Sequence, residues 1–147
     1  MKKRSIRLQK IIALAEAEER NLGAITGRAQ ARLREQLARL GELNVYRQEY
    51  AHKAQRNAEL HSAHWKDYQN FLFRLDGAVR SQQAIVQECQ QNLDAHRRQW
   101  MTKRQRLESL DRVRQRFQQE EKIHEDRIEQ RIQDELPAAE ESYKPDS

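Results

Sequence analysis

The chain has 147 residues, of which 35% are charged, two are prolines and four are glycines. Together with apolar residues at regular spacing, this composition is typical of a long helix or coiled coil and argues against a layered globular domain. The formal net charge is +5, but its distribution is uneven: residues 1–60 carry 13 basic and 7 acidic side chains, residues 61–117 carry 11 and 6, and residues 118–147 carry 4 and 10.

The first predicted helix spans about residues 3–56. Its apolar stripe recurs every three or four residues, through Leu8, Ile11 or Ile12, Ala15, Leu22, Ile25, Ala29, Leu33, Leu37, Leu40, Leu43, Tyr46 and Tyr50. This spacing places one apolar face along a helix. The apolar run IIALA is too short for the core of a secretory signal, so we interpret the N-terminal segment as the start of this helix. Gly23 and Gly27 are interpreted as tolerated weak positions rather than as a packing motif.

A turn is expected at about residues 57–63, the only stretch between the stripes with plausible turn chemistry. Ser62 is the expected N-cap, because its hydroxyl can accept a hydrogen bond from an early amide of the next helix. The second predicted helix spans about residues 64–136. The Leu136-Pro137 step is expected to end it, leaving residues 137–147 as a flexible acidic tail.

The second helix carries a regular 3.5-residue repeat, which is the pattern of a coiled-coil seam. Its positions are Tyr68, Leu72, Leu75, Val79, Gln82, Val86, Cys89, Leu93, His96, Trp100, Lys103, Leu107, Leu110, Arg114 and Phe117. After Phe117 the seam fades. If the chain folds back near residue 59, Met1 falls opposite Phe117. The length of the first helix and the end of the apolar repeat therefore both predict that helix pairing ends near Phe117. We therefore predict an all-α fold: two long helices in an antiparallel coiled-coil hairpin over residues 1–136, with a C-terminal helical overhang.

Six of the nine aromatic residues lie between Tyr46 and Phe73, near the predicted turn. Some of these rings fill the seam, but two helices cannot enclose all of them. Phe71 stands beside the seam and forms a stripe with Leu75, Ala78 and Gln82, whereas Phe73 points away. Grouped exposed rings are typical of a binding surface.

The sequence contains no catalytic motif, so we expect a protein that is not an enzyme and needs no cofactor. His52, His61 and His64 cluster near the turn, and we interpret them as solvated histidines rather than metal ligands. No stretch of about 18 apolar residues is present, so no transmembrane segment is expected. The single Cys89 suits a reducing compartment, which favours the cytoplasm.

The predicted hairpin pools basic residues at its terminal end, where MKKRSIRLQK lies beside Arg112, Arg114 and Arg116. Such an end is attracted to an acidic surface. Nucleic acid is an alternative partner, but the aromatic residues are not interleaved with the basic ones and no nucleic-acid-binding motif is present. A self-associating coiled-coil scaffold is a further alternative.

The segments YRQEY, WKDYQNFLFRLDGAVRSQQ and WMTKRQRLESLDRVRQRF resemble the FliJ family, the stalk-like component of the flagellar type III export apparatus. The resemblance implies a hairpin similar to the shaft of rotary ATPases, inserted in the ring of the export ATPase FliI. It also implies contacts with the export gate FlhA and with export chaperones, at the cytoplasmic face of the membrane. The equivalent stalk of a virulence secretion system is the runner-up within this class.

The resemblance also implies two sets of site residues. The gate-facing residues are Tyr46, Tyr50, Phe71, Leu75 and Ala78, extended by Leu43 and Gln82. The terminal end is the part that would enter the ATPase ring, through Lys2, Lys3, Arg4, Arg7, Arg112, Arg114 and Arg116.

Overall fold

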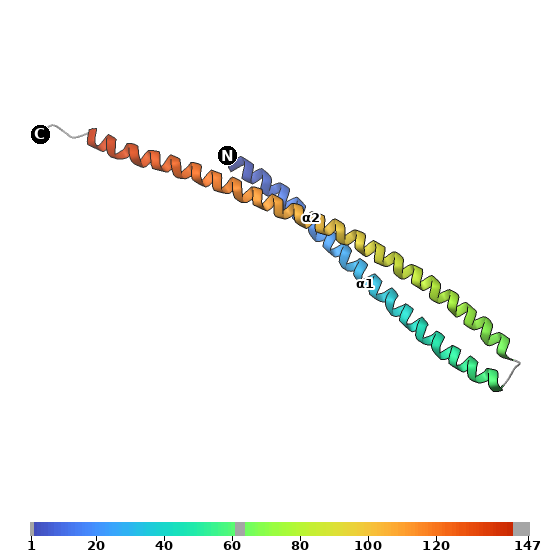
Figure 1. Ribbon diagram of the computed structural model, residues 1–147. Coiled ribbons are helices and arrows are strands. Elements are labelled where there is room, and N and C mark those ends of the chain that lie inside the picture. The colour runs from blue at the N-terminus through green and yellow to red at the C-terminus, as the bar shows by residue number, and fades with distance from the viewer. Residues whose placement is uncertain (1, 61–63, 143–147) are drawn as a thin grey trace. The chain divides into compact units, whose positions relative to one another are not determined.

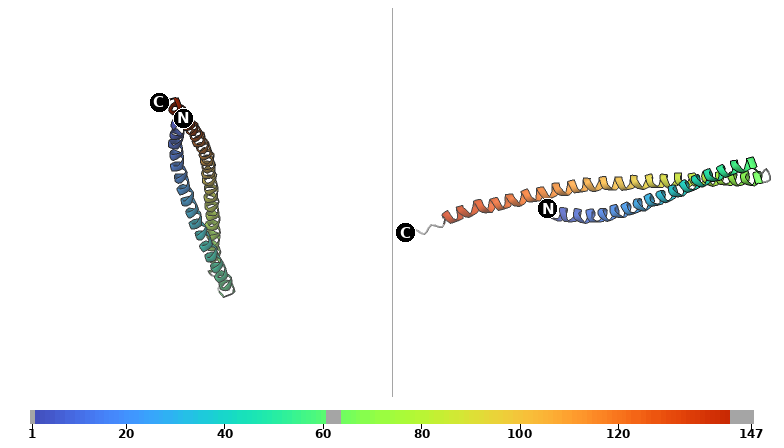
Figure 2. Two further views of the ribbon diagram at one scale, coloured as in Figure 1. Left: turned by 90° about the vertical axis from the view of Figure 1, so that its left-hand side faces the viewer. Right: turned by 90° about the horizontal axis from the view of Figure 1, so that it is seen from below.

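The computed structural model describes residues 2–60 and 64–142, with the side chains of residues 4–56 and 64–136. The described residues form two long helices, α1 (Lys2–Leu60) and α2 (Trp65–Ser142), which run beside each other in opposite directions (Figures 1 and 2). Among the described residues there is no strand. The predicted all-α antiparallel hairpin is confirmed.

The helix ends differ from the expected ones. The first helix continues to Leu60 instead of ending near residue 56, and the second begins at Trp65. The proposed N-cap Ser62 lies outside the described residues. The expected stop at Leu136 was wrong, because α2 runs through Pro137 to Ser142. A proline removes one helical hydrogen bond and crowds the preceding turn, which bends a helix without having to end it.

The chain divides into two compact units: Met1–Glu19 with Thr102–Ser147, and Arg20–Met101. In the Arg20–Met101 unit, the core is a cluster of Leu33, Cys89 and Leu93, against which Ala29 and Val86 pack. Leu93 is only 2% exposed. Every predicted seam position of α2 is buried or half-buried, up to Phe117 in the other unit. The 3.5-residue repeat therefore identified the packed face of α2 correctly.

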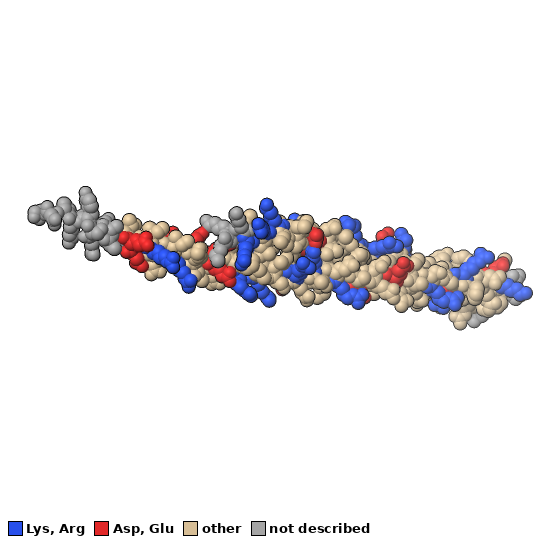
Figure 3. All heavy atoms as spheres, turned by 90° about the horizontal axis from the view of Figure 1, so that it is seen from above, with Lys and Arg blue, Asp and Glu red and all other residues tan. Residues whose placement is uncertain are grey.

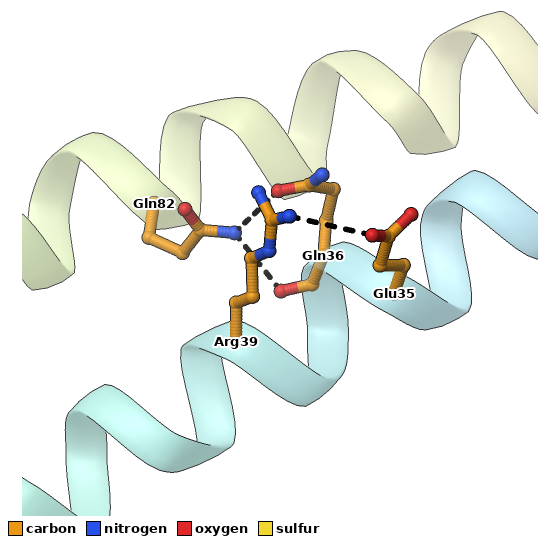
Figure 4. A network of polar contacts seen from close by, with 4 residues as sticks. All are labelled: Glu35, Gln36, Arg39 and Gln82. Atoms are coloured by element: carbon orange, nitrogen blue, oxygen red, sulfur yellow. Dashed lines mark hydrogen bonds and ion pairs between the residues drawn. The ribbon is translucent and has the colours of Figure 1, made fainter.

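Two positions of the predicted α1 stripe, Leu37 and Tyr46, are exposed instead of packed. Leu37 is 47% exposed, and its neighbour Gln36 is buried instead. The Gln82 amide donates hydrogen bonds to the Gln36 carbonyl oxygen (3.0 Å) and to the Gln36 side-chain oxygen (2.8 Å) (Figure 4). Buried amides are tolerated when they are paired. A pattern of apolar residues alone does not identify Gln36 as a packed position. Its position is nevertheless regular, because Leu33, Gln36 and Leu40 are three and four residues apart.

The two glycines of the GAITG segment have different surroundings. A Cβ atom on Gly23 would lie 3.3 Å from three atoms of the Trp100 indole, whereas a Cβ on Gly27 would meet nothing within 4 Å. The interpretation of both as tolerated weak positions therefore fails for Gly23. Its missing side chain makes room for a tryptophan on the facing helix.

In the Met1–Glu19 and Thr102–Ser147 unit, Leu8, Ile12 and Ala15 are buried along α1. Glu18 forms an ion pair with Lys103. The Ser5 hydroxyl donates a hydrogen bond to the Glu121 carboxylate at 2.9 Å. Helix pairing thus reaches Glu121, beyond the expected end at Phe117, whereas Met1 itself lies outside the described residues. Pairing extends beyond Phe117 because α1 continues further before the turn than predicted.

Beyond Glu121, α2 continues as the predicted overhang (Figure 1). Every side chain of residues 122–136 is exposed.

Candidate partner-binding surfaces

Four rings gather near the end of the hairpin where α1 ends and α2 begins. The Tyr50 ring is the centre of the group, with ring-centroid distances of 4.4 Å to Phe71, 5.3 Å to Tyr68 and 6.4 Å to Tyr46. Tyr46 also meets Phe71 edge to face at 6.4 Å. These distances are typical of favourable aromatic pairs. Leu43 lies one turn before Tyr46 on α1, and we call these five residues the aromatic surface.

The residues predicted to face the gate differ in how much surface they present. Tyr46 is 49% exposed, whereas Leu43, Tyr50 and Phe71 are half-buried. Ala78 is exposed. Leu75 and Gln82 are only 7% and 8% exposed, because both are seam positions. These two side chains therefore present little surface to a partner.

Tyr46 stands between two open hollows. The first has a volume of about 460 Å³ and is lined by Arg39, Glu42, Leu43, Tyr46 and Gln82. The second has a volume of about 420 Å³ and is lined by Gly41, Glu42, Val45, Tyr46 and Glu49. Because the tyrosine lines both hollows, its ring forms a ridge that a partner side chain can flank on either side.

Four further residues line these hollows and were not predicted from the sequence: Arg39, Glu42, Val45 and Glu49. Spacing along α1 could have predicted Arg39, Glu42 and Glu49, because residues three or four positions from Leu43 or Tyr46 share a helical face with these residues. Arg39 donates a hydrogen bond to Glu35 at 3.3 Å (Figure 4), and both Arg39 and Gln82 line the first hollow. Charged groups therefore rim an apolar centre, which is the usual composition of a protein interface.

The phenol of Tyr50 is electrostatically perturbed. Partial burial raises its pKa above the ordinary value of 10.0, and the neighbouring Tyr68, Tyr46 and Asp67 raise it further. Both effects disfavour the phenolate. Tyr50 is thus held in its neutral form within the ring cluster.

Phe73 is 71% exposed, and among the described residues it makes none of the ring contacts of the aromatic surface. It lines a separate hollow with Val79, Arg80 and the Arg47–Asp76 ion pair. The expectation that Phe73 points away from the seam agrees with this exposure. Phe73 therefore supplies a natural control for experiments on the aromatic surface.

The predicted basic end is only partly as expected. Arg4, Arg7, Arg112 and Arg116 are exposed, and the side chains of Lys2 and Lys3 lie outside the described residues. Arg114 is half-buried and forms an ion pair with Asp111.

Acidic residues lower the net positive charge that was predicted for the terminal end of the hairpin. Arg4 lines one small hollow with Phe117, Glu120 and Glu121. Along the face shown in Figure 3, acidic side chains also lie among the Lys and Arg residues. The prediction of a basic end rested on the basic residues alone, whereas the longer helix pairing brings Glu120 and Glu121 beside Arg4.

The described residues were also compared with what a metal site or a membrane span requires. In the described part of the chain, no group of three or more His, Cys, Asp or Glu side chains is placed to hold a metal ion. Within the same residues, no helix is long and apolar enough to cross a membrane. His52 and His64 are exposed, and His61 lies outside the described residues.

The fold defines a coiled-coil hairpin protein. The family model described as the flagellar FliJ protein matches residues 3–140. The chain therefore belongs to the FliJ family, which is a component of the flagellar protein export apparatus and not a known enzyme family. Among curated proteins and among solved structures, nothing matches the chain.

Proposed function

We propose that this protein is a non-enzymatic stalk that couples the export ATPase to the export gate. The end of the hairpin that carries both termini enters the ring of the ATPase FliI, and the aromatic surface docks on the gate protein FlhA. The protein also handles export chaperones. Through these partners it works at the cytoplasmic face of the membrane.

The observation that supports this proposal best is the aromatic surface itself. Its rings come from both helices and contact one another, so the hairpin fold holds them in place before any partner arrives. Preorganised aromatic anchors lose little conformational freedom on binding. Tyr46 combines a half-exposed ring with a hollow on each side, which is the geometry of an interface anchor.

The gate contact can be tested by comparing two exposed rings. Tyr46→Ala is expected to weaken binding to FlhA by about 2 kcal/mol, the usual loss for an aromatic anchor. Phe73→Ala removes a more exposed ring outside the aromatic surface and should leave the affinity nearly unchanged. Isothermal titration with purified FlhA measures both, and circular dichroism confirms that each hairpin is folded. Equal losses in the two variants would contradict the assignment.

The ring contact can be tested through its charges. Replacing the exposed Arg112 and Arg116 by glutamine should weaken stimulation of FliI ATPase activity and flatten its dependence on salt, since exposed charges act over only about 8 to 10 Å at physiological ionic strength. A double replacement of Arg34 and Arg56, which are exposed elsewhere on α1, is the control with the same change in net charge. Unchanged stimulation by the Arg112/Arg116 variant would argue against this part of the proposal.

A further inference from the structure

A basic hollow lies between the helices in the Arg20–Met101 unit, away from the aromatic surface. It has a volume of about 240 Å³, and its apolar part is formed by Ile25, Ala29 and Cys89. The hollow arises because small side chains, Ala29 and Cys89, occupy the seam beside the tightly packed Leu93. The rigid core next to it holds the hollow in shape.

The rim of the hollow is positively charged. Arg28 and Arg32 stand one turn apart on α1, and Asn92 and His96 line the α2 side. No acidic residue lines the hollow, and within the described residues neither arginine forms an ion pair.

Two acidic residues that are close to the rim in sequence have other contacts. Glu35 accepts a hydrogen bond from Arg39 at 3.3 Å, and Asp94 accepts one from Gln90 at 3.1 Å. Two guanidinium groups one turn apart repel each other unless an anion lies between them. The rim is therefore suited to an occupant that brings carboxylates one turn apart.

The overhang of α2 has the complementary pattern. Ile128, Ile132 and Leu136 are exposed and follow one another at steps of four, so they lie on one helical face. By the same periodicity, Glu125 and Glu129 lie on this face, one turn apart. The overhang thus presents an apolar stripe with two carboxylates beside it.

The two patterns match position by position. In the hollow, apolar residues at 25 and 29 alternate with arginines at 28 and 32; in the overhang, glutamates at 125 and 129 alternate with isoleucines at 128 and 132. When one face is laid on the other, carboxylates can meet guanidinium groups and isoleucines can meet the apolar floor. The contact would satisfy a charged rim and cover an apolar stripe at the same time.

We propose that the hollow binds the overhang of a second copy of this chain, with Glu125 and Glu129 opposite Arg28 and Arg32. A continuous helix cannot fold back on itself, and Asn92 and Glu125 belong to the same helix, so the occupant has to come from another molecule. Each copy carries one hollow and one overhang. A twofold dimer therefore forms two such contacts and closes, instead of growing into a filament. This dimer goes beyond the proposed stalk function and does not depend on it.

Charge reversal tests the contact directly. Sedimentation equilibrium of the full chain up to about 100 µM should show a dimer of micromolar affinity. Arg28→Glu with Arg32→Glu, or Glu125→Arg with Glu129→Arg, should each raise the dissociation constant roughly tenfold or more, because attraction becomes repulsion at both contacts. Mixing the two variants in equal amounts should restore the dimer. In the mixed dimer the reversed hollow of one variant faces the reversed overhang of the other, and the wild-type hollow faces the wild-type overhang, so both contacts are attractive again.

Two controls make the outcome decisive. Arg20→Glu with Arg34→Glu makes the same change in net charge at exposed positions of α1 outside the hollow, and should leave the dimer intact. Circular dichroism checks helicity, and the milder Arg28→Gln with Arg32→Gln replaces any charge-reversed variant that unfolds. A wild-type protein that stays monomeric throughout, reversals without effect in folded protein, or a mixture that fails to recover would each overturn the proposal.

Discussion

Two places in the Arg20–Met101 unit show how large aromatic side chains are accommodated between two helices. Trp100 is half-buried and lies against Gly23, whose missing side chain leaves space for the indole. Near the other end of the unit, Tyr50, Tyr68 and Phe71 meet other rings across the helices, and Tyr46 remains 49% exposed. Where the facing residue is a glycine, the ring packs into the seam; where it is another ring, part of the cluster stays outside.

This difference explains how one repeat can yield both a core and a binding surface. Two helices enclose a strip only about one aliphatic side chain wide, as the burial of Leu33 and Leu93 shows. Tyrosine and phenylalanine exceed that width, so their excess area becomes available to a partner. The aromatic surface is thus a consequence of overfilling the seam.

The largest expected effect separates the aliphatic core from its surroundings. Leu93→Ala should lower the free energy of unfolding by about 2 to 3 kcal/mol, the lower range for leucine truncation in a core. Leu37→Ala should cost less than about 0.5 kcal/mol, because Leu37 is exposed. Urea unfolding followed by circular dichroism measures both. Similar losses of unfolding free energy in the two variants would contradict the assignment of Leu93 to the core and Leu37 to the surface.

A smaller effect tests the role of Gly23. Gly27→Ala should stabilise the hairpin by about 0.5 to 1 kcal/mol, the usual gain for replacing a glycine in a helix interior. Gly23→Ala gains the same helix propensity but brings its Cβ within 3.3 Å of the Trp100 ring. We therefore expect it to be less stable than the Gly27 variant by about 1 kcal/mol in thermal unfolding. Equal stabilities would show that Trp100 packs equally well without the glycine.

The smallest effect concerns the overfilled part of the seam at alkaline pH. The pKa of Tyr50 is raised by partial burial and by its neighbours, so folding favours the neutral phenol. The resulting stabilisation is fully present below the ordinary tyrosine pKa of about 10. Above that pH the unfolded chain ionises first, so the stabilisation is lost as the pH rises from about 10 through the raised pKa of the folded state. Tyr50→Phe should reduce this alkaline loss. The urea midpoint measured from pH 8 upwards checks it, and identical pH profiles for the two proteins would contradict it.

Sequence periodicity was sufficient for the fold and for most of the packed face. Regular steps of three and four residues predicted every seam position of α2 from Tyr68 to Phe117, because a supercoiled helix keeps one stripe towards its partner. The stripe of α1 was less certain where the repeat included Gln36, since a polar residue at a seam position gives no hydrophobic signal. Its burial depends on the amide of Gln82 across the interface.

By itself, the sequence determined that the chain forms two long antiparallel helices, that their seam fades near Phe117, and that the aromatic residues gather near one end. Only the tertiary structure decided which members of that group remain accessible: Leu75 and Gln82 are buried, and Tyr46 is half-exposed between two hollows. It also decided that Gly23 makes room for Trp100 and that Glu120 and Glu121 lie beside Arg4. The physical reason is that periodicity fixes the direction of a side chain around its own helix, whereas exposure and charge pairing depend on the size and chemistry of the residues opposite.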